Sequence, residues 1–257
     1  MNSAEAREAD ISAADVYLQP HSDDICFSLG AFADARHRGR LLTVFPTAGY
    51  VATRPGAAAQ PVEQVTRVRL AEDQAFADLC GLETKTVDLA GASVLGHPSF
   101  DLGFADDNAT RTRGPLMAAL RALAPQPAPR SRPWLFCPSG IGGHVDHVTV
   151  LQLICSHYED LRGIYRIGFY EDLHYAADPA GRRAGLDRLH RIVGDRALAR
   201  HAFRYNGRAG RKLALIALYR SQFLELPATV AEFSPATSLP PAPHEAIWTE
   251  EPDGPVA

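Results

Sequence analysis

The chain has 257 residues, with 26 Lys and Arg against 30 Asp and Glu, which gives a formal net charge of −4 at pH 7. Hydrophobic residues make up 46% and charged residues 22%, which are ordinary values for a folded globular protein and exclude a wholly disordered chain. The mild negative charge argues against a protein that binds nucleic acid by neutralising phosphates, so we expect no nucleic-acid partner.

Short apolar runs alternate with longer helical patterns along the chain, which is typical of an α/β protein. The expected strands are 16–18, 41–45, 84–89, 134–137 and 165–170. The expected helices are 25–38, 62–79, 116–123, 147–161 and 211–223. This order predicts one Rossmann-like, doubly wound, mostly parallel sheet.

Three segments are expected to lie outside the sheet. The stretch 91–113 is rich in Gly, Asp and Asn, which predicts a functional or mobile loop. The Pro-rich stretch 125–133 predicts a connector. Proline is also frequent from residue 227 onward, which predicts a domain over 1–226 and a C-terminal arm over 227–257 that wraps the surface. Trp248 is expected to pack this arm onto the domain.

No apolar run reaches the ~18–20 residues that span a bilayer, and residues 1–15 lack the apolar core of a signal peptide. Cys26, Cys80, Cys137 and Cys155 lie far apart and form no CxxC pair. Their apolar neighbours favour buried free thiols over disulfides. We therefore expect a cytoplasmic protein without a membrane anchor; the sequence leaves homo-oligomerisation open.

A first polar cluster, His21-Ser22-Asp23-Asp24, directly follows the first expected strand. His21 and Asp24 are three residues apart, so a tight turn could point both side chains at one centre. Asp23 would then lie close to anything that they bind. Alternatively, Ser22, Asp23 or Asp24 only caps the helix that follows.

A second polar cluster follows the fourth expected strand and contains His144, Asp146 and His147. His144 and His147 are spaced to share one side of a first helical turn. Nearby glycines allow the backbone to turn tightly and to approach a ligand. The alternative is a pair of surface histidines, with Asp146 capping the helix.

The carboxyl ends of parallel strands meet at one edge of a sheet, so both clusters can converge on a single metal ion. Two histidines and one carboxylate are a common ligand set for catalytic zinc and leave a position open for water. A carboxylate beside that water would be a general base, and a second histidine would be an acid or an oxyanion stabiliser.

The pair of clusters resembles the PIG-L/LmbE family of zinc-dependent N-acetylglucosaminyl deacetylases. This family carries a His-Pro-Asp-Asp-Glu run after its first strand and a His-x-Asp-His run later. The resemblance extends over about 16–222 and includes Arg69 and Glu72, because the family also carries an Arg and a Glu in the corresponding helix. It implies that small-molecule amino sugars are the substrates.

The resemblance also implies a role for each residue of the two clusters. The implied metal ligands are His21, Asp24 and His147. The metal would be Zn²⁺, with Fe²⁺ left open. Asp23 would be the general base, His144 would stabilise the oxyanion, and Asp146 would orient a histidine.

Substrate contacts are implied for Arg69 and for Glu171-Asp172, which looks like a Tyr-Glu-Asp element seen in some members of the family. The sequence departs from the family pattern at Ser22, which replaces a proline, and at Ile25, which replaces a glutamate. The change at Ile25 leaves the identity of the substrate open.

The expected function is therefore the zinc-dependent removal of an N-acetyl group from an amino-sugar-containing specialised metabolite or glycoconjugate precursor. An amidase or esterase acting on a non-sugar substrate would use the same residues, and a non-catalytic sugar- or metal-binding protein would also keep the ligands. A nucleotide-binding Rossmann enzyme is disfavoured because no expected strand is followed by G-x-G-x-x-G. A serine hydrolase is disfavoured because Ser139 has no G-x-S-x-G elbow around it.

Overall fold

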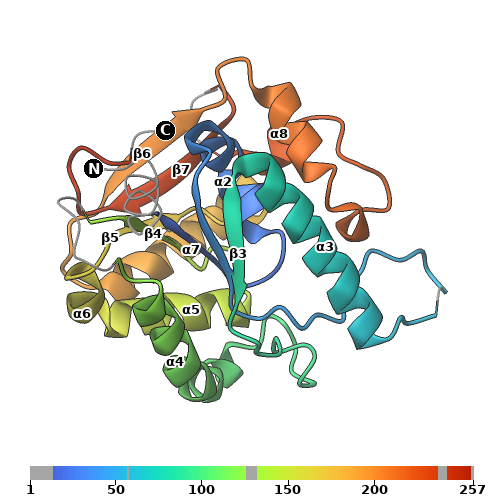
Figure 1. Cartoon of the computed structure of the whole chain (residues 1–257), viewed down its shortest axis with the longest axis horizontal. Coiled ribbons are helices and arrows are strands. Elements are labelled where there is room, and N and C mark those ends of the chain that lie inside the picture. Colours follow the sequence, from blue (N-terminus) through green and yellow to red (C-terminus); the bar gives the residue numbers. More distant parts are fainter. Residues whose placement is uncertain (1–13, 57, 126–131, 237–241, 256–257) are drawn as a thin grey trace, which may run out of the picture.

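Figure 1 shows the computed structural model of the chain, which describes residues 14–56, 58–125, 132–236 and 242–255. The strands are β1 (Val16–Gln19), β2 (Gly39–Thr43), β3 (Leu82–Thr86), β4 (Trp134–Pro138), β5 (Arg166–Tyr170), β6 (Ala199–Arg204) and β7 (His244–Thr249). The helices are α2 (Asp24–Arg36), α3 (Val62–Cys80), α4 (Ala105–Ala122), α5 (Val145–Ser156), α6 (Tyr158–Arg162), α7 (Pro179–Val193) and α8 (Ala209–Ile216). The predictions for 1–15 and 125–133 fall almost wholly outside the described residues.

The described strands form one sheet in the order β3-β2-β1-β4-β5-β7-β6. Strands β1 to β5 pair in parallel, whereas β7 is antiparallel to both of its neighbours. The predicted α/β fold with a doubly wound, mostly parallel sheet is therefore confirmed.

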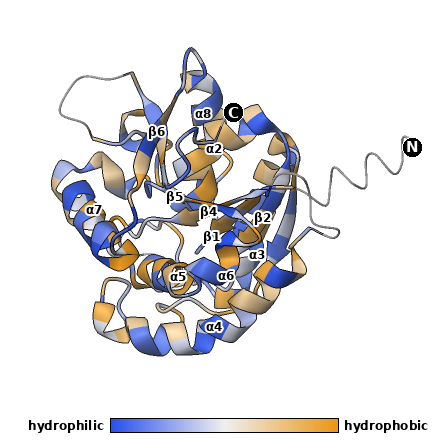
Figure 2. Cartoon of the chain, turned by 90° about the vertical axis from the view of Figure 1, so that its left-hand side faces the viewer, coloured by the Kyte–Doolittle hydropathy of each residue, from blue (hydrophilic) through white to orange (hydrophobic). Residues whose placement is uncertain are grey.

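Helices cover both faces of the sheet, because successive side chains of each strand point to opposite sides. On β1, Val16 and Leu18 are buried against α4, α5 and α7, whereas Tyr17 is buried against α2, α3 and α8. Figure 2 shows the two layers, with α4, α5 and α6 on one side of the sheet and α2 and α8 on the other. Each face of the sheet thus has its own hydrophobic cluster.

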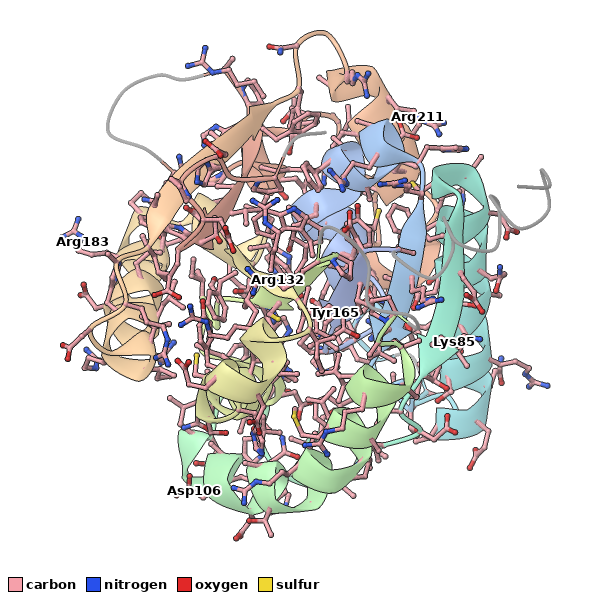
Figure 3. All side chains as sticks on the ribbon, turned by 60° about the vertical axis from the view of Figure 1, so that its left-hand side comes forward. Lys85, Asp106, Arg132, Tyr165, Arg183 and Arg211 are labelled. Atoms are coloured by element: carbon pink, nitrogen blue, oxygen red, sulfur yellow. The ribbon has the colours of Figure 1, made fainter. Side chains whose placement is uncertain are left out.

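Charged side chains on the outer helices point into solvent, as Figure 3 shows for Asp106 and Arg183. Tyr165 lies inside the molecule instead, and its hydroxyl donates to the carbonyl of Leu120 at 2.7 Å. No helix of the described residues is both long and apolar enough to cross a membrane. The four cysteines are free thiols, as predicted. Cys26, Cys80 and Cys137 are buried, whereas Cys155 is only half-buried.

The direction of winding reverses between β1 and β4. The chain proceeds from β1 outward to β2 and β3, and from β4 outward in the other direction to β5. Connections on either side of such a reversal leave a crevice at the carboxyl ends of the two strands, where ligands commonly bind. Both polar clusters of the sequence follow these two strands.

The predicted loop over 91–113 is wrong in its second half, because α4 already begins at Ala105. The helix is hard to recognise in the sequence because it contains Gly114 and Pro115 and begins with acidic residues. The buried side chains Ala105, Asn108, Ala109 and Thr112 nevertheless recur at helical spacing and face the core. The helix expected at 116–123 is therefore the end of a longer one.

The C-terminal part of the chain also differs from the prediction. Helix α7 and strand β6 were not expected, and His244–Thr249 form strand β7 inside the sheet rather than part of a surface arm. Trp248 lies on this strand and donates from Nε1 to Glu171 at 3.0 Å. The domain boundary at residue 226 stays a prediction.

Candidate active site

The first polar cluster forms a tight turn between β1 and α2. Asp23 occupies the N-cap position with a φ of 122° and makes no side-chain capping hydrogen bond. A non-glycine residue with such a φ is strained, at a cost of about 1–3 kcal/mol. The carboxylate of Asp24 accepts a hydrogen bond from the backbone N–H of His21 at 2.8 Å. Asp23 is therefore held toward the crevice and does not cap the helix.

The second polar cluster forms the turn between β4 and α5. Gly142 has a φ of 89°, and a Cβ atom there would lie 2.4 Å from the ring of Tyr175. His144 caps α5, because its Nδ1 accepts the backbone N–H of Asp146 at 3.2 Å. The side chain of Asp146 does not act as the cap of this helix and is free to bind elsewhere.

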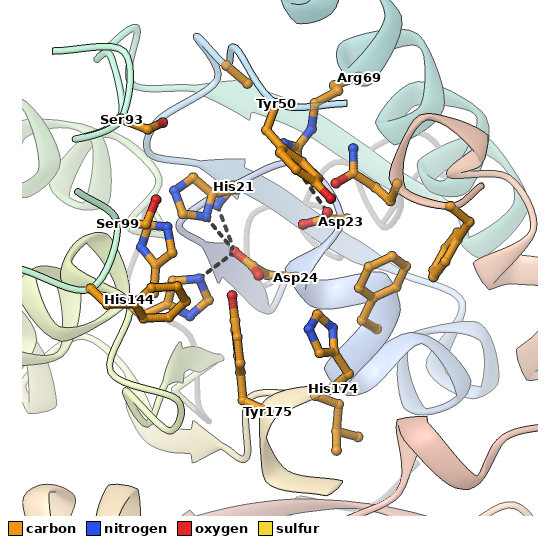
Figure 4. A pocket seen from close by; sticks show the side chains of 18 of the residues that line it. His21, Asp23, Asp24, Tyr50, Arg69, Ser93, Ser99, His144, His174 and Tyr175 are labelled. Atoms are coloured by element: carbon orange, nitrogen blue, oxygen red, sulfur yellow. Dashed lines mark hydrogen bonds and ion pairs between the residues drawn. The ribbon is translucent and has the colours of Figure 1, made fainter. Parts of the chain in front are cut away.

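The two clusters meet at the sheet edge, as the sequence predicted. Potential ligand atoms of His21, His144 and His147 all lie within 4.8 Å of one another. The Oδ2 atom of Asp24 lies 3.6 Å from Nδ1 of His21 and 3.3 Å from Nε2 of His147. Figure 4 shows Asp24 beside His21, with Asp23 to one side.

Asp146 holds His21 from behind. Its Oδ2 lies 2.8 Å from Nε2 of His21, and its carboxylate also accepts the backbone N–H of Ala92 and the amide N–H of Asn108. Asp146 is fully buried. The predicted role of Asp146 in orienting a histidine is thus matched by a contact, and Nδ1 of His21 is left on the side of Asp24.

Asp172 holds His147 in the same way. Its Oδ1 lies 2.8 Å from Nδ1 of His147, while Oδ2 accepts the hydroxyl of Ser139 at 2.7 Å and the backbone N–H of Ile141 at 3.0 Å. A carboxylate behind each imidazole is the usual support of metal-ligating histidines, since it fixes the tautomer and the ring orientation.

The site favours a positive charge. Burial alone lowers the pKa of His21, but hydrogen bonds to Asp146 and Asp24 outweigh it and raise the pKa to about 10. Burial would raise the pKa of Asp24, but the neighbouring His147 and His21 hold it well below its usual range. A divalent cation would take the place of the proton on His21, so imidazoles and carboxylate together fit a metal ion.

His144 differs from the other two histidines. Burial, followed by repulsion from His21 and His147, lowers the pKa of His144 to about 3. The imidazole is therefore neutral, and because Nδ1 accepts a backbone N–H, its proton belongs on Nε2. His144 can thus donate a hydrogen bond into the crevice.

Arg69 reaches the site from α3 and is 5% exposed. Its Nη2 donates to Oδ2 of Asp23 at 2.8 Å and to the carbonyl of Ser22. Burial raises the pKa of Asp23 to about 7, although the charge of Arg69 opposes this shift. Arg69 also lines the cavity above the cluster, so its predicted substrate contact stays a prediction.

The predicted substrate contacts of Glu171 and Asp172 are wrong in this structure. Neither residue lines the cavity, and both are buried. Consecutive side chains point in opposite directions here: Asp172 turns to His147, whereas Glu171 binds Arg182 and Arg200 on the far side. Asp172 therefore orients His147, and Glu171 binds arginines of neighbouring elements; neither side chain faces the cavity.

Tyr175 belongs to the site, although no pattern in the sequence pointed to it. Its hydroxyl points toward Asp24 in Figure 4 and makes no hydrogen bond with another described residue. Burial raises the pKa of Tyr175 well above its ordinary value of 10, so the hydroxyl remains a donor. His174, beside it, also lines the cavity. The packing of Tyr175 against Gly142 is one of the contacts that bring this segment to the crevice.

No family model matches the sequence. Over 179 residues the chain is 29% identical to the 2'-N-acetylparomamine deacetylase of Streptomyces fradiae, a match that covers 66% of this chain and 59% of that protein. The match thus spans less than two thirds of the length of that relative.

Solved structures share the fold at low sequence identity. A deacetylase of teicoplanin biosynthesis, in complex with teicoplanin, has a TM-score of 0.51 and 14% identity over 91% of this chain and 96% of that one. A second structure, the deacetylase-bog complex of teicoplanin biosynthesis, has a TM-score of 0.51 and 15% identity, again over 91% of this chain and 96% of that one. These likenesses establish a common fold.

Proposed function

We propose that this chain, which has the fold of the PIG-L/LmbE deacetylases, is a metal-dependent hydrolase that removes an N-acetyl group from an amino-sugar-containing small molecule. One observation carries the proposal: two buried carboxylates hold His21 and His147 from behind, so that their other nitrogens face Asp24. The curated relative, a deacetylase by name, supports the reaction class.

His21, Asp24 and His147 would hold the metal, Zn²⁺ or Fe²⁺. When bound, such a metal polarises the acetyl carbonyl and makes the attacking water easier to deprotonate. His144 is the other candidate ligand, because it belongs to the same group of close histidines. Its Nδ1 is already engaged by a backbone N–H, which favours Asp24 as the third ligand.

Asp23 would act as the general base. The water oxygen bonds to the acetyl carbon while one water proton passes to the carboxylate, whose pKa of about 7 suits proton transfer near neutral pH. Arg69 binds Oδ2 of Asp23, so Oδ1 remains for the water. The C–N bond then breaks, and Asp23 returns the proton to the leaving nitrogen, which gives a free amine and acetic acid. The acid loses its remaining proton to the solvent and is released as acetate.

His144 would stabilise the negative charge that develops on the carbonyl oxygen. The neutral ring donates from Nε2, and it does so from a position fixed by its capping bond to α5. The hydroxyl of Tyr175, which also lines the cavity, offers a second donor. Preorganised donors of this kind are usually the largest single contribution to acyl-transfer catalysis.

Metal content and acetate release test the proposal together. We expect about one zinc or iron per chain and release of acetate from N-acetylated amino sugars. His147→Ala should lose the metal, whereas His144→Ala should keep it and lose about 10²–10³ in rate, the typical cost of one oxyanion donor. The exposed His190 provides a matched control, and His190→Ala should change neither quantity.

Equal metal loss in His144→Ala and His147→Ala would contradict the assigned ligands. A wild-type protein that binds no zinc on titration would contradict the metal centre itself. A metal-loaded protein that releases acetate only from non-sugar amides or esters would replace the amino sugar by the alternative substrate class.

A further inference from the structure

The cavity above His21, Asp24 and His147 has a volume of about 430 Å³, and its lining includes five Phe and Tyr side chains. One wall contains Phe100 and Tyr175, whose ring centroids are 6.3 Å apart. Phe27 and Phe223 form another aromatic pair, with centroids 5.6 Å apart. Tyr50 belongs to the lining as well and lies on the side of Arg69 in Figure 4.

Two of these rings are unusually exposed. Tyr50 is 61% exposed and Phe100 60% exposed, although large aromatic side chains normally bury most of their surface. An exposed apolar surface beside a cavity with a few converging polar groups is typical of a ligand site. A flat apolar group placed against either ring would remove part of this surface from water.

The charged residues of the cavity also favour an uncharged substituent over a polycationic one. Its only carboxylates among the described lining residues are Asp23 and Asp24. Asp23 is paired with Arg69, and Asp24 faces His21 and His147. No carboxylate of the lining is left to receive the ammonium groups of a polycationic substrate, and a bound metal would repel them further.

Neutral polar groups are present instead. Thr47, Ser93 and Ser99 contribute hydroxyl groups to the lining, and Gln222 contributes an amide. Such groups suit the hydroxyls of a sugar ring, because they donate and accept hydrogen bonds without a net charge.

We propose that the substrate is an N-acetylated amino sugar that carries an aromatic or similarly flat apolar substituent and has no cluster of positive charges. The sugar would lie over His21, Asp24 and His147, and the substituent would lie against Phe100. This inference rests on the proposed deacetylase function and specifies its substrate class. It excludes amine-rich pseudodisaccharides as the preferred substrates.

Three acetylated compounds separate the substrate classes. Acetate release by the metal-loaded full chain is measured with 4-nitrophenyl N-acetyl-β-D-glucosaminide, with the methyl glycoside of the same sugar, and with 2'-N-acetylparomamine. We expect kcat/KM for the aryl glycoside to exceed that for each of the other two at least tenfold. Phe100→Ala should lower the aryl-to-methyl ratio about tenfold, mainly through KM.

Leu102→Ala is the matched control, because Leu102 is also an exposed apolar residue of this segment but does not line the cavity. This variant should leave the aryl-to-methyl ratio unchanged. Equal rates with the aryl and methyl glycosides, or a preference for 2'-N-acetylparomamine, would overturn the inference while supporting deacetylation.

Binding measured by titration calorimetry keeps this inference separate from the proposed function. The aryl glycoside should bind the unaltered chain at least tenfold more tightly than the methyl glycoside, and Phe100→Ala should remove the difference. If none of the three compounds releases acetate, the deacetylase function fails, and calorimetry still decides on the aromatic site. Equal affinities for the two glycosides would overturn it.

Discussion

Asp172 does not line the cavity itself, yet we expect it to govern metal affinity. It accepts a hydrogen bond from Nδ1–H of that imidazole and is itself fixed by Ser139 and Ile141. Asp172→Asn keeps the size of the side chain but removes the negative charge. Losses of 10–100-fold in metal affinity are typical of such supporting carboxylates, and we expect a loss of this size in a chelator competition titration.

An exposed aspartate serves as the control for this experiment. Asp160 lies on the surface of α6, and Asp160→Asn should leave the affinity unchanged. If Asp172→Asn bound metal as tightly as the wild type, His147 would not owe its ligand geometry to the carboxylate.

The residues that carry the chemistry could be predicted because ligand spacing is visible in a sequence. His21, Asp24, His144 and His147 are short-range pairs placed after strands, and the structure brings them together. The direction of a buried carboxylate is not visible in this way. The resemblance to a Tyr-Glu-Asp element led us to expect Asp172 at the substrate. Its actual partners, Ser139 and Ile141, come from a different turn and are not visible in the sequence.

At the level of elements, Glu171 joins the end of β5 to α7, β6 and β7. Its carboxylate binds Arg182, Arg200 and the indole N–H of Trp248. Burial would raise the pKa of Glu171, but hydrogen bonds and charges from Arg182 and Arg200 outweigh it and lower the pKa from 4.5. Glu171 is fully buried, so the ion pairs are little screened by solvent.

This lowered pKa predicts a pH-dependent contribution to stability. Because the folded pKa lies below the unfolded one, the stabilisation is present above about pH 4.5 and is lost as the pH falls through the folded pKa. Glu171→Gln should lower the free energy of unfolding by about 3 kcal/mol at pH 7, the lower end for breaking a buried pair. The difference should shrink below pH 4.5, as measured by urea unfolding.

The exposed Glu159 pairs with Arg162 and Arg196 and provides the control. Glu159→Gln should cost less than about 1 kcal/mol at either pH, as surface pairs do. A constant difference between Glu171→Gln and the wild type from pH 7 to pH 3 would show that packing, and not the charge of Glu171, stabilises this junction.

The elements around this junction escaped prediction because their polar residues find partners only in the folded molecule. β7 carries Glu245, which is fully buried and bound to Lys212 of α8 at 2.6 Å. Glu245 also accepts the backbone N–H groups of Ala31 and Phe32, next to the non-helical Leu29 in α2. A buried charge of this kind looks like a surface residue in the sequence.

For the whole molecule, the position of β7 predicts that the last part of the chain is needed for folding. Removal of residues 227–257 would take β7 from between β5 and β6 and would leave Lys212 buried without its carboxylate partner. Removing one partner of a buried pair typically costs about 3–5 kcal/mol, a large share of the stability of a domain. We expect the shortened chain to lack a cooperative thermal transition in circular dichroism.

A chain that ends after Glu251 keeps β7 and is the control for this truncation. It should unfold cooperatively near the temperature of the full chain. If residues 1–226 alone unfolded as cooperatively as the full chain, the domain boundary predicted from the proline content would hold, and β7 would be an addition to a complete sheet.

β7 is the last of the described strands to be synthesised, yet it lies inside the sheet. Until it leaves the ribosome, β6 has no strand to pair with among the described ones, and the outer edge of β5 stays open. Unpaired strand edges readily recruit strands of other chains. The interval between the synthesis of β6 and that of β7 is therefore when a nascent chain is most exposed to wrong pairing with its neighbours.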